Sequence, residues 1–205
     1  MEVLNSNLVE WGVAERRLAG EMLSGDLHKV MPRGDGVLIA VADGLGHGAA
    51  AAAAAGLALE TVEQCAHQAL VQVLKNCNQK LQRTRGAVLT IAFLNALDGS
   101  MEWLGVGDVR GVLVRSMPGA KALTECLSLS SGFIGGKLPP VRAATLKIAT
   151  GDTLVLVTDG IRKGFEEGLV LSARPQKAAE SILRRDGLDT DDALVLVATF
   201  QGRAR

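Results

Sequence analysis

The chain has 205 residues, of which 48% are hydrophobic and 3% aromatic, and its 22 basic and 22 acidic side chains give a formal net charge of zero. This length and apolar content predict one compact domain spanning residues 1–205 rather than a disordered chain. The balanced charge and the scarcity of aromatic side chains argue against a protein whose main task is to bind nucleic acid.

Three features of the sequence favour the cytoplasm. The N-terminal segment lacks the basic and apolar regions of a signal peptide. No apolar run is long enough to cross a bilayer. The cysteines, Cys65, Cys77 and Cys126, are odd in number and lack CxxC spacing, so we expect free thiols in a reducing compartment. We therefore expect a cytoplasmic monomer that does not associate with membranes.

The first elements along the chain are a strand and two helices. Residues 36–42 form a short continuous apolar run, which predicts a buried strand. A helix is expected from about His47, because the seven consecutive alanines at 49–55 have the highest helix propensity. Their small side chains would also let this helix lie very close to a sheet. A second helix is predicted over residues 69–82.

After these helices the hydrophobic pattern changes to that of strands. We expect a strand at 86–97 that ends in an Asp98-Gly99 hairpin turn, followed by two strands at 100–117 that are broken at 105–108. A Gly- and Pro-rich loop at 131–140 then leads to two strands at 142–158, which are joined by a Gly151-Asp152 turn. The last elements are a helix from Pro175 to just before Gly187 and a strand at 192–200. Such blocks of strands and helices predict an α+β fold with antiparallel sheets and the helices packed outside.

Aspartates adjoin several of these apolar segments. Aspartate is depleted in strands and costly to bury unless it is paired or metal-bound. Turn formation explains any single Asp-Gly, but not two matching strand ends together with an acidic pair before a third strand. Carboxylates gathered in this way would form an all-oxygen site suited to two Mg²⁺ or Mn²⁺ ions. The residues concerned are Asp26 after Gly25, Asp43 before Gly44, Asp159 before Gly160, and Asp191 with Asp192.

These segments carry a resemblance to a known family. "VADGLGHG", "LVLVTDG" and "DTDDALVLV", with "SGD" upstream, resemble the metal-dependent protein serine/threonine phosphatases of type 2C (the PPM family). The resemblance is closest to the SpoIIE-type branch and its stressosome phosphatases, since "RGAVLTIAFLN", "VGDVRGVLV" and "SGFIGGKLPP" follow in order between the acids. It covers residues 25–200 or so. It implies a four-layer α-β-β-α sandwich of two mainly antiparallel sheets flanked by helices.

The resemblance also implies a site and a reaction. Asp43 would bridge two Mn²⁺ or Mg²⁺ ions, and the carbonyl of Gly44 would bind one of them. Asp159 and Asp191 would complete the shell of the other ion, with Asp192 as the alternative to Asp191. A hydroxide that bridges the metals would attack phosphoserine or phosphothreonine. Asp26 would hold that hydroxide or a metal-bound water, so Asp26 and Asp43 are the expected catalytic residues.

The same resemblance implies a phosphorylated signalling protein as substrate, namely a STAS-domain component of the stressosome. Two departures from the family pattern are visible. Eukaryotic members carry a histidine directly after the first Asp-Gly, whereas this chain has Leu45 there and places the histidine at His47. No arginine stands in a matching motif near the N-terminus, where the family binds phosphate.

Two other functions remain open on the sequence alone. Residues 44–49 match the G-x-G-x-x-A turn of dinucleotide-binding proteins, with Glu60 or Glu63 near the distance expected for a ribose contact. That interpretation would place Asp43 against a pyrophosphate and leaves Asp159 unexplained. A non-catalytic regulatory module of the phosphatase fold would be expected to have lost acids, and none of the key acids is missing.

Overall fold

Two five-stranded sheets form the centre of the molecule. The computed structural model describes residues 8–116, 123–167, 169, 171 and 174–202. One sheet has the strand order β1-β10-β9-β6-β7 and the other β2-β3-β4-β5-β8, and all neighbouring strands are antiparallel. The strands are β1 (Val9–Arg16), β2 (Asp26–Arg33), β3 (Gly36–Gly44), β4 (Ala87–Asn95), β5 (Ser100–Val106), β6 (Arg110–Val114), β7 (Thr124–Cys126), β8 (Ala144–Lys147), β9 (Thr153–Val157) and β10 (Ala193–Phe200).

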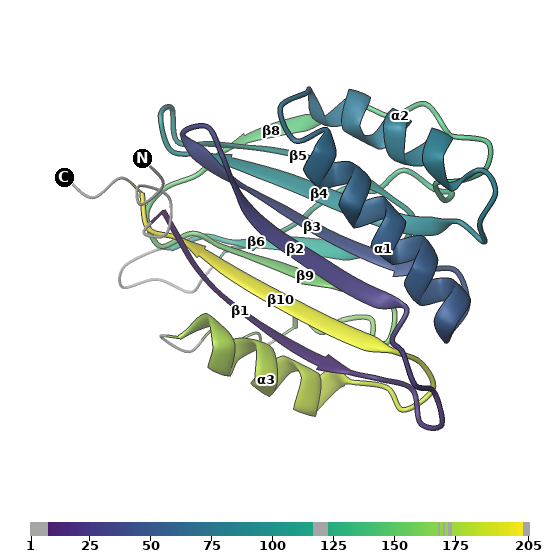
Figure 1. Cartoon of the computed structure of the whole chain (residues 1–205). Helices are drawn as coiled ribbons and strands as arrows, with labels where there is room; N and C mark the ends of the chain where they lie inside the picture. Colours follow the sequence, from purple (N-terminus) through teal and green to yellow (C-terminus); the bar gives the residue numbers. More distant parts are fainter. Residues whose placement is uncertain (1–7, 117–122, 168, 170, 172–173, 203–205) are drawn as a thin grey trace.

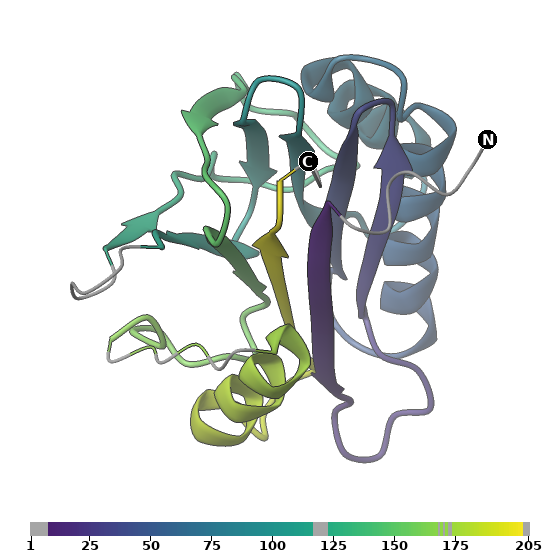
Figure 2. The same cartoon turned by 90° about the vertical axis from the view of Figure 1, so that its left-hand side faces the viewer.

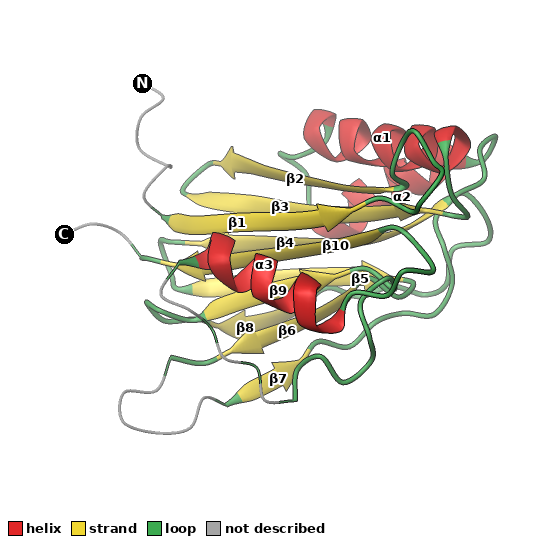
Figure 3. Cartoon of the chain, turned by 90° about the horizontal axis from the view of Figure 1, so that it is seen from below, coloured by secondary structure: helices red, strands yellow, loops and turns green. Residues whose placement is uncertain are grey.

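Helices cover the outer face of each sheet. Helices α1 (Ala49–Gln64) and α2 (Leu70–Leu81) pack on the sheet that contains β3, as Figure 1 shows. Helix α3 (Pro175–Asp186) packs on β1 and β10 of the other sheet. The view in Figure 2 separates α3 from α1 and α2 on opposite sides of the sheets, and Figure 3 shows α3 lying across its sheet. The predicted four-layer α-β-β-α arrangement is therefore confirmed.

Four layers enclose three hydrophobic cores, and the central strands contribute to two of them at once. In β3, Ile39 and Val41 face the core between the sheets, whereas Leu38 and Ala40 face the core beneath α1 and α2. Side chains alternate between the faces of a strand, so a central strand must be apolar at every position. This explains why residues 36–42 read as one continuous apolar run.

The alanines of α1 let this helix lie against β3 at very short range. Ala51, Ala54, Ala55 and Ala58 are buried against the sheet. A Cβ added to Gly44 would lie only 2.0 Å from the carbonyl oxygen of Ala51. The alanines of α1 and the glycine at position 44 are both needed for the helix to lie this close to β3. The alanine run predicted this close packing.

The predicted helices and the hairpin between β4 and β5 are confirmed, and the helix bounds differ by one or two residues from those expected. Strands β1, β2 and β7 were not predicted. The break at 105–108 carries the chain from one sheet to the other, because β5 and β6 belong to different sheets. Asp152 does more than form a turn: it is 4% exposed and accepts hydrogen bonds from Arg115 (2.9 Å) and the backbone N–H of Ser116 (2.8 Å).

The other structural expectations concern membranes and thiols. Within the described part of the chain, no helix has the length and apolar character needed to cross a membrane. Cys65, Cys77 and Cys126 are free thiols, as expected from their spacing. Cys77 is buried, and burial raises its pKa to about 12.

Candidate active site

The predicted acids gather at one end of the sandwich because of the antiparallel topology. Asp26 begins β2 and lies opposite Asp43, near the end of β3, in the strand register. In the other sheet, Asp159 follows the end of β9, and Asp191 precedes the start of the neighbouring strand β10. The ends of strands from both sheets therefore meet at the same place.

A cavity of about 440 Å³ lies at this end of the molecule. Its carboxylates come from four separate places in the sequence: Asp43, Asp108, Asp159 and Asp191. The remaining lining residues are Leu45, Gly46, Val88, Gly107, Ser131, Gly132 and Phe133. Of the predicted site residues, Asp43, Asp159 and Asp191 are thus brought together around one space.

The structure gives Asp191 and Asp192 different environments. Asp191 lines the cavity, where it faces the other acids. Asp192 is 3% exposed, and its two carboxylate oxygens accept hydrogen bonds from the backbone N–H groups of Leu18 (2.8 Å) and Gly25 (2.7 Å). Asp192 therefore fastens the segment before β2 to the start of β10, and Asp191 is the better candidate for a metal ligand.

Asp26 lies behind the cavity rather than in its wall. It is 2% exposed, and the hydroxyl of Thr158 donates a hydrogen bond of 2.7 Å to its Oδ2. The same hydroxyl accepts a hydrogen bond of 2.8 Å from the backbone N–H of Leu194, which fixes its orientation. Burial raises the pKa of Asp26 to about 7, while the Thr158 hydrogen bond acts in the opposite direction.

The electrostatics of the cavity are dominated by uncompensated negative charge. Burial, with the nearby charge of Asp26 as the next cause, raises the pKa of Asp43 to about 9. The pKa of Asp159 is also raised, by burial and then by the charge of Asp191, although Arg110 partly offsets this effect. Carboxylates held together in this way require protons or cations to neutralise them. Hard, all-oxygen donors of this kind fit Mg²⁺ or Mn²⁺.

The acids alone do not form a complete ligand shell among the described residues. Among the described residues, no group of three or more His, Cys, Asp or Glu side chains converges closely enough to hold a metal ion by itself. Mg²⁺ usually keeps several waters and takes only one or two carboxylates from the protein. The donor set therefore fits ions whose shells are completed largely by water.

Glycines bring the strand ends close to their neighbours. A Cβ on Gly160 would lie 1.9 Å from the carbonyl oxygen of Asp192, so only glycine lets the chain after Asp159 approach the start of β10. The backbone N–H of Gly44 donates to the carbonyl of Gly25 (3.0 Å). Gly44 is buried beside Asp43 and is not among the residues that line the cavity.

Sequence reasoning missed three residues at this cavity. Asp108 follows "LGVG" at the end of β5, a pattern close to the "V-x-D" strand ends of Asp43 and Asp159, and this signal could have found it. Phe133 and Arg85 carry no comparable signal. Phe133 lines the cavity and is 39% exposed. Arg85 reaches the rim, since a Cβ on Gly46 would lie 2.9 Å from its Nη1.

His47 does not line the cavity. Its side chain is 60% exposed, and its Nδ1 pairs with the carboxylate of Glu21 just before α1 begins. Arg16, one of the N-terminal arginines, is engaged elsewhere: it pairs with Asp189 at 2.9 Å and donates to the carbonyl of Leu188. Both departures from the family pattern seen in the sequence therefore persist in the structure.

The two antiparallel sheets, the outer helices and the acidic strand ends define the fold of the type-2C phosphatases. A family model described as "Stage II sporulation protein E (SpoIIE)" matches residues 33–201. The chain therefore belongs to the SpoIIE family. It is 28% identical to the phosphoserine phosphatase RsbX of Bacillus subtilis (strain 168) over 142 residues. This alignment covers 69% of this chain and 69% of RsbX.

Solved structures agree with this assignment. RsbX in complex with magnesium matches with a TM-score of 0.85 at 22% identity, over 98% of this chain and 100% of that one. A structure from work on the bacterial stressosome as a modular system that controls secondary messenger signalling matches with a TM-score of 0.82 at 25% identity, over 93% and 98% of the two chains. The catalytic domain of the phosphatase PstP with two manganese ions has a TM-score of 0.71 at 16% identity, over 94% and 98%.

These findings confirm the predicted family and the predicted enzyme class, a phosphatase of the PPM type. They also decide against the dinucleotide-binding alternative. That site needs a parallel βαβ unit, whereas β4, the strand that follows α1 and α2, is antiparallel to β3. Glu60 and Glu63 both lie on α1 rather than at the end of a second strand.

Proposed function

We propose that the protein removes phosphate from phosphoserine or phosphothreonine on a bacterial signalling protein and that it needs Mn²⁺ or Mg²⁺ for this. One observation carries the proposal: Asp43, Asp159 and Asp191, from strand ends of both sheets, line a single cavity with too little positive charge to balance them. A phosphate ester carries negative charge itself, so this cavity can accept it only when cations are present.

We assign the metal ligands as follows. Asp43, Asp159 and Asp191 would hold two ions, with Asp43 shared between them, and the carbonyl of Gly44, the residue next to Asp43, would supply a further oxygen. The environment of Asp192, which is saturated by backbone donors, supports the choice of Asp191. Bound divalent cations lower the pKa of water and neutralise charge on the phosphate.

Other residues of the chain hold the acids in position. Thr158 holds the carboxylate of Asp26 in a fixed orientation beside Asp43, and we assign to Asp26 the role of orienting the water that attacks. Arg110 donates to the carbonyls of Ile161 and Arg162, which holds the loop after Asp159 in place. Asp26 and the loop that carries Asp159 are thus held in place although the neighbouring acids repel one another.

The substrate we propose is a phosphorylated STAS-domain protein of a stressosome. Two likenesses support this choice: the relative named phosphoserine phosphatase RsbX, and the fold shared with a structure from work on the stressosome. The first supports a phosphoserine substrate, and the second supports a component of a stressosome.

The test is metal-dependent release of phosphate. With millimolar Mn²⁺, the protein should hydrolyse p-nitrophenyl phosphate and phosphothreonine peptides, and EDTA should abolish both activities. Asp43→Asn should lose Mn²⁺ binding, measured by calorimetry, together with activity. A wild-type protein that binds Mn²⁺ but leaves all these substrates intact would favour a non-catalytic module of the same fold.

A further inference from the structure

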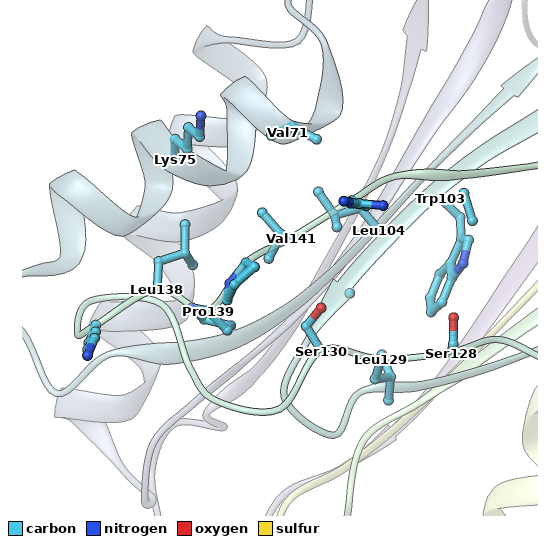
Figure 4. Close-up of a pocket in the computed structure, with 15 residues that line it drawn as sticks. Val71, Lys75, Trp103, Leu104, Ser128, Leu129, Ser130, Leu138, Pro139 and Val141 are labelled. Atoms are coloured by element: carbon cyan, nitrogen blue, oxygen red, sulfur yellow. The ribbon is translucent and has the colours of Figure 1, made fainter.

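A second cavity, of about 820 Å³, has none of the clustered acids among its lining residues (Figure 4). It lies between helix α2, strand β5 and two segments of the following chain, 128–130 and 137–142. Strand β5 forms its floor, where Trp103 and Leu104 are each only 2% exposed, so the accessible apolar surface comes from the walls. Val71 of α2 and Leu138 and Val141 of the later segment form its walls, as Figure 4 shows.

Positive charge surrounds this apolar groove. Lys75 of α2, Lys137 and Arg142 line it and are all exposed, and no acidic residue lines it. No described residue forms an ion pair with any of the three. The whole chain has a net charge of zero, so this local excess is not a general property of the surface. Unpaired cations around apolar walls are complementary to an anionic partner with an apolar anchor.

We propose that this groove docks an acidic segment of the phosphoprotein substrate, with one aliphatic side chain between the walls formed by Val71, Leu138 and Val141 and with carboxylates near the three surrounding cations. A protein segment fits better than a nucleic acid, because the walls of the groove offer apolar contact rather than a continuous line of positive charge for a phosphate backbone. The consecutive residues Pro139 and Pro140 give the groove one conformationally restricted wall, so less order has to be gained on binding.

The groove and the acidic cavity are lined by consecutive residues of one chain segment. Ser130 lines the groove, and the next residue, Ser131, lines the acidic cavity. Two hydrogen bonds of 2.9 Å fix this connection: the N–H of Ser130 donates to the carbonyl of Gly105, and the N–H of Gly107 donates to the carbonyl of Ser130. A chain docked in the groove would therefore hold its phosphorylated residue near the acids. This part of the inference rests on the proposed function.

The first experiment measures docking without catalysis. The probe is a fluorescein-labelled peptide in which one leucine is flanked on each side by glutamates, and the readout is fluorescence anisotropy. The double variant Lys75→Glu/Arg142→Glu should bind it about tenfold more weakly, since two attractive contacts become repulsive. The matched control is Lys177→Glu/Arg184→Glu on α3, which makes the same change of charge on the opposite outer face and should bind like the wild type.

The second experiment connects docking to catalysis. The same acidic peptide is joined through Gly-Ser linkers of several lengths to a phosphothreonine segment. The groove variant should raise KM for the best of these peptides by about tenfold, with kcat and the hydrolysis of p-nitrophenyl phosphate unchanged. The control variant should change neither value. Melting temperatures of both double variants verify that they are folded.

The outcomes separate the two proposals. Equal weakening by the groove and control variants would show that only net charge matters and would overturn the docking site. A leucine-to-serine probe that binds as well as the original, or tighter binding of a single-stranded oligonucleotide or of anionic vesicles, would also overturn it. Wild-type protein that fails to hydrolyse p-nitrophenyl phosphate would contradict the proposed function, while the anisotropy measurement would still test the groove.

Discussion

The adjacent acids Asp191 and Asp192 should respond to substitution in opposite ways. Asp192 accepts two hydrogen bonds from backbone N–H groups, those of Leu18 and Gly25, and is almost fully buried. A hydrogen bond to a charged group contributes about 1.5–3 kcal/mol, so the loss of two such bonds in Asp192→Ala costs on the order of 3–6 kcal/mol and leaves the buried N–H of Gly25 without its partner. Repulsion between Asp192 and Asp26 offsets part of this loss.

For a chain of this length, 1 kcal/mol corresponds to about 2–4 °C in Tm, so Asp192→Ala should melt about 10 °C below the wild type. Asp191→Ala removes a carboxylate from the cavity wall, where it raises the pKa of Asp159 by repulsion. Its Tm in EDTA should stay close to that of the wild type, since the removal of a repulsive charge offsets the loss of the hydrogen bond that Asp191 Oδ1 accepts from the N–H of Asp192 (2.8 Å).

Two measurements distinguish the variants. Differential scanning fluorimetry in EDTA gives the stability of the metal-free protein, and calorimetry with Mn²⁺ gives the metal affinity. Asp191→Ala should lose Mn²⁺ affinity and phosphatase activity at unchanged stability. If instead Asp192→Ala kept its Tm and lost Mn²⁺ binding, while Asp191→Ala bound the metal normally, our assignment of the ligand would be refuted.

Three further perturbations test other features of the site. In EDTA, the free energy of unfolding should fall between about pH 6 and pH 8, by up to about 1.4 kcal/mol per unit for each carboxyl concerned. The folded Asp43 and Asp26 carboxyls keep their protons up to pKa values of about 9 and about 7, whereas the unfolded ones ionise near pH 4. Asp43→Asn should flatten this slope, and a wild type without the slope would contradict the charge cluster. Gly160→Ala should lower both the Tm and the Mn²⁺ affinity, because the added Cβ would lie 1.9 Å from the carbonyl oxygen of Asp192. The control Gly56→Ala should lower neither, because the nearest neighbour of its Cβ is 3.9 Å away. Equal effects of the two variants would rule out the close approach at Gly160 as the cause. Arg85→Ala should raise KM for phosphopeptides more than for p-nitrophenyl phosphate, and equal KM changes would remove Arg85 from the recognition of the peptide chain.

The central elements could be predicted because burial imposes a simple pattern on them. Strands such as β3 and β10 are buried on both faces, and almost every residue in them is apolar. Strands β1 and β2 lie at sheet edges and are partly exposed, so their sequences mix charged, polar and apolar residues. β2 even contains Pro32, which an edge strand tolerates but a central strand does not. No local pattern distinguishes such edge strands from loops.

From the sequence, the only site residues that could be predicted were acids at the ends of apolar strands. Asp43 and Asp159 stand directly after apolar runs, whereas the choice between Asp191 and Asp192 depends on where β10 begins and which side chain then faces the cavity. A shift of one residue exchanges the two faces of a strand, so adjacent acids cannot be separated without the register. Arg85 reaches the cavity only because the folded chain brings it against Gly46, 39 positions away in the sequence.

The origin of the acids in both sheets links metal binding to folding. Asp43 and Asp26 belong to one sheet and Asp159 and Asp191 to ends of strands in the other, so the acids meet only after the sheets have packed. The hydrophobic core between the sheets must therefore overcome their mutual repulsion in the metal-free protein. An ion that binds only the folded state stabilises it by RT ln(1 + [L]/Kd), about 2.7 kcal/mol at a hundredfold excess over Kd. The repulsion between the acids destabilises the metal-free protein, and a bound divalent cation relieves the same repulsion. Mn²⁺ should therefore raise the Tm most at the pH where the metal-free protein is least stable.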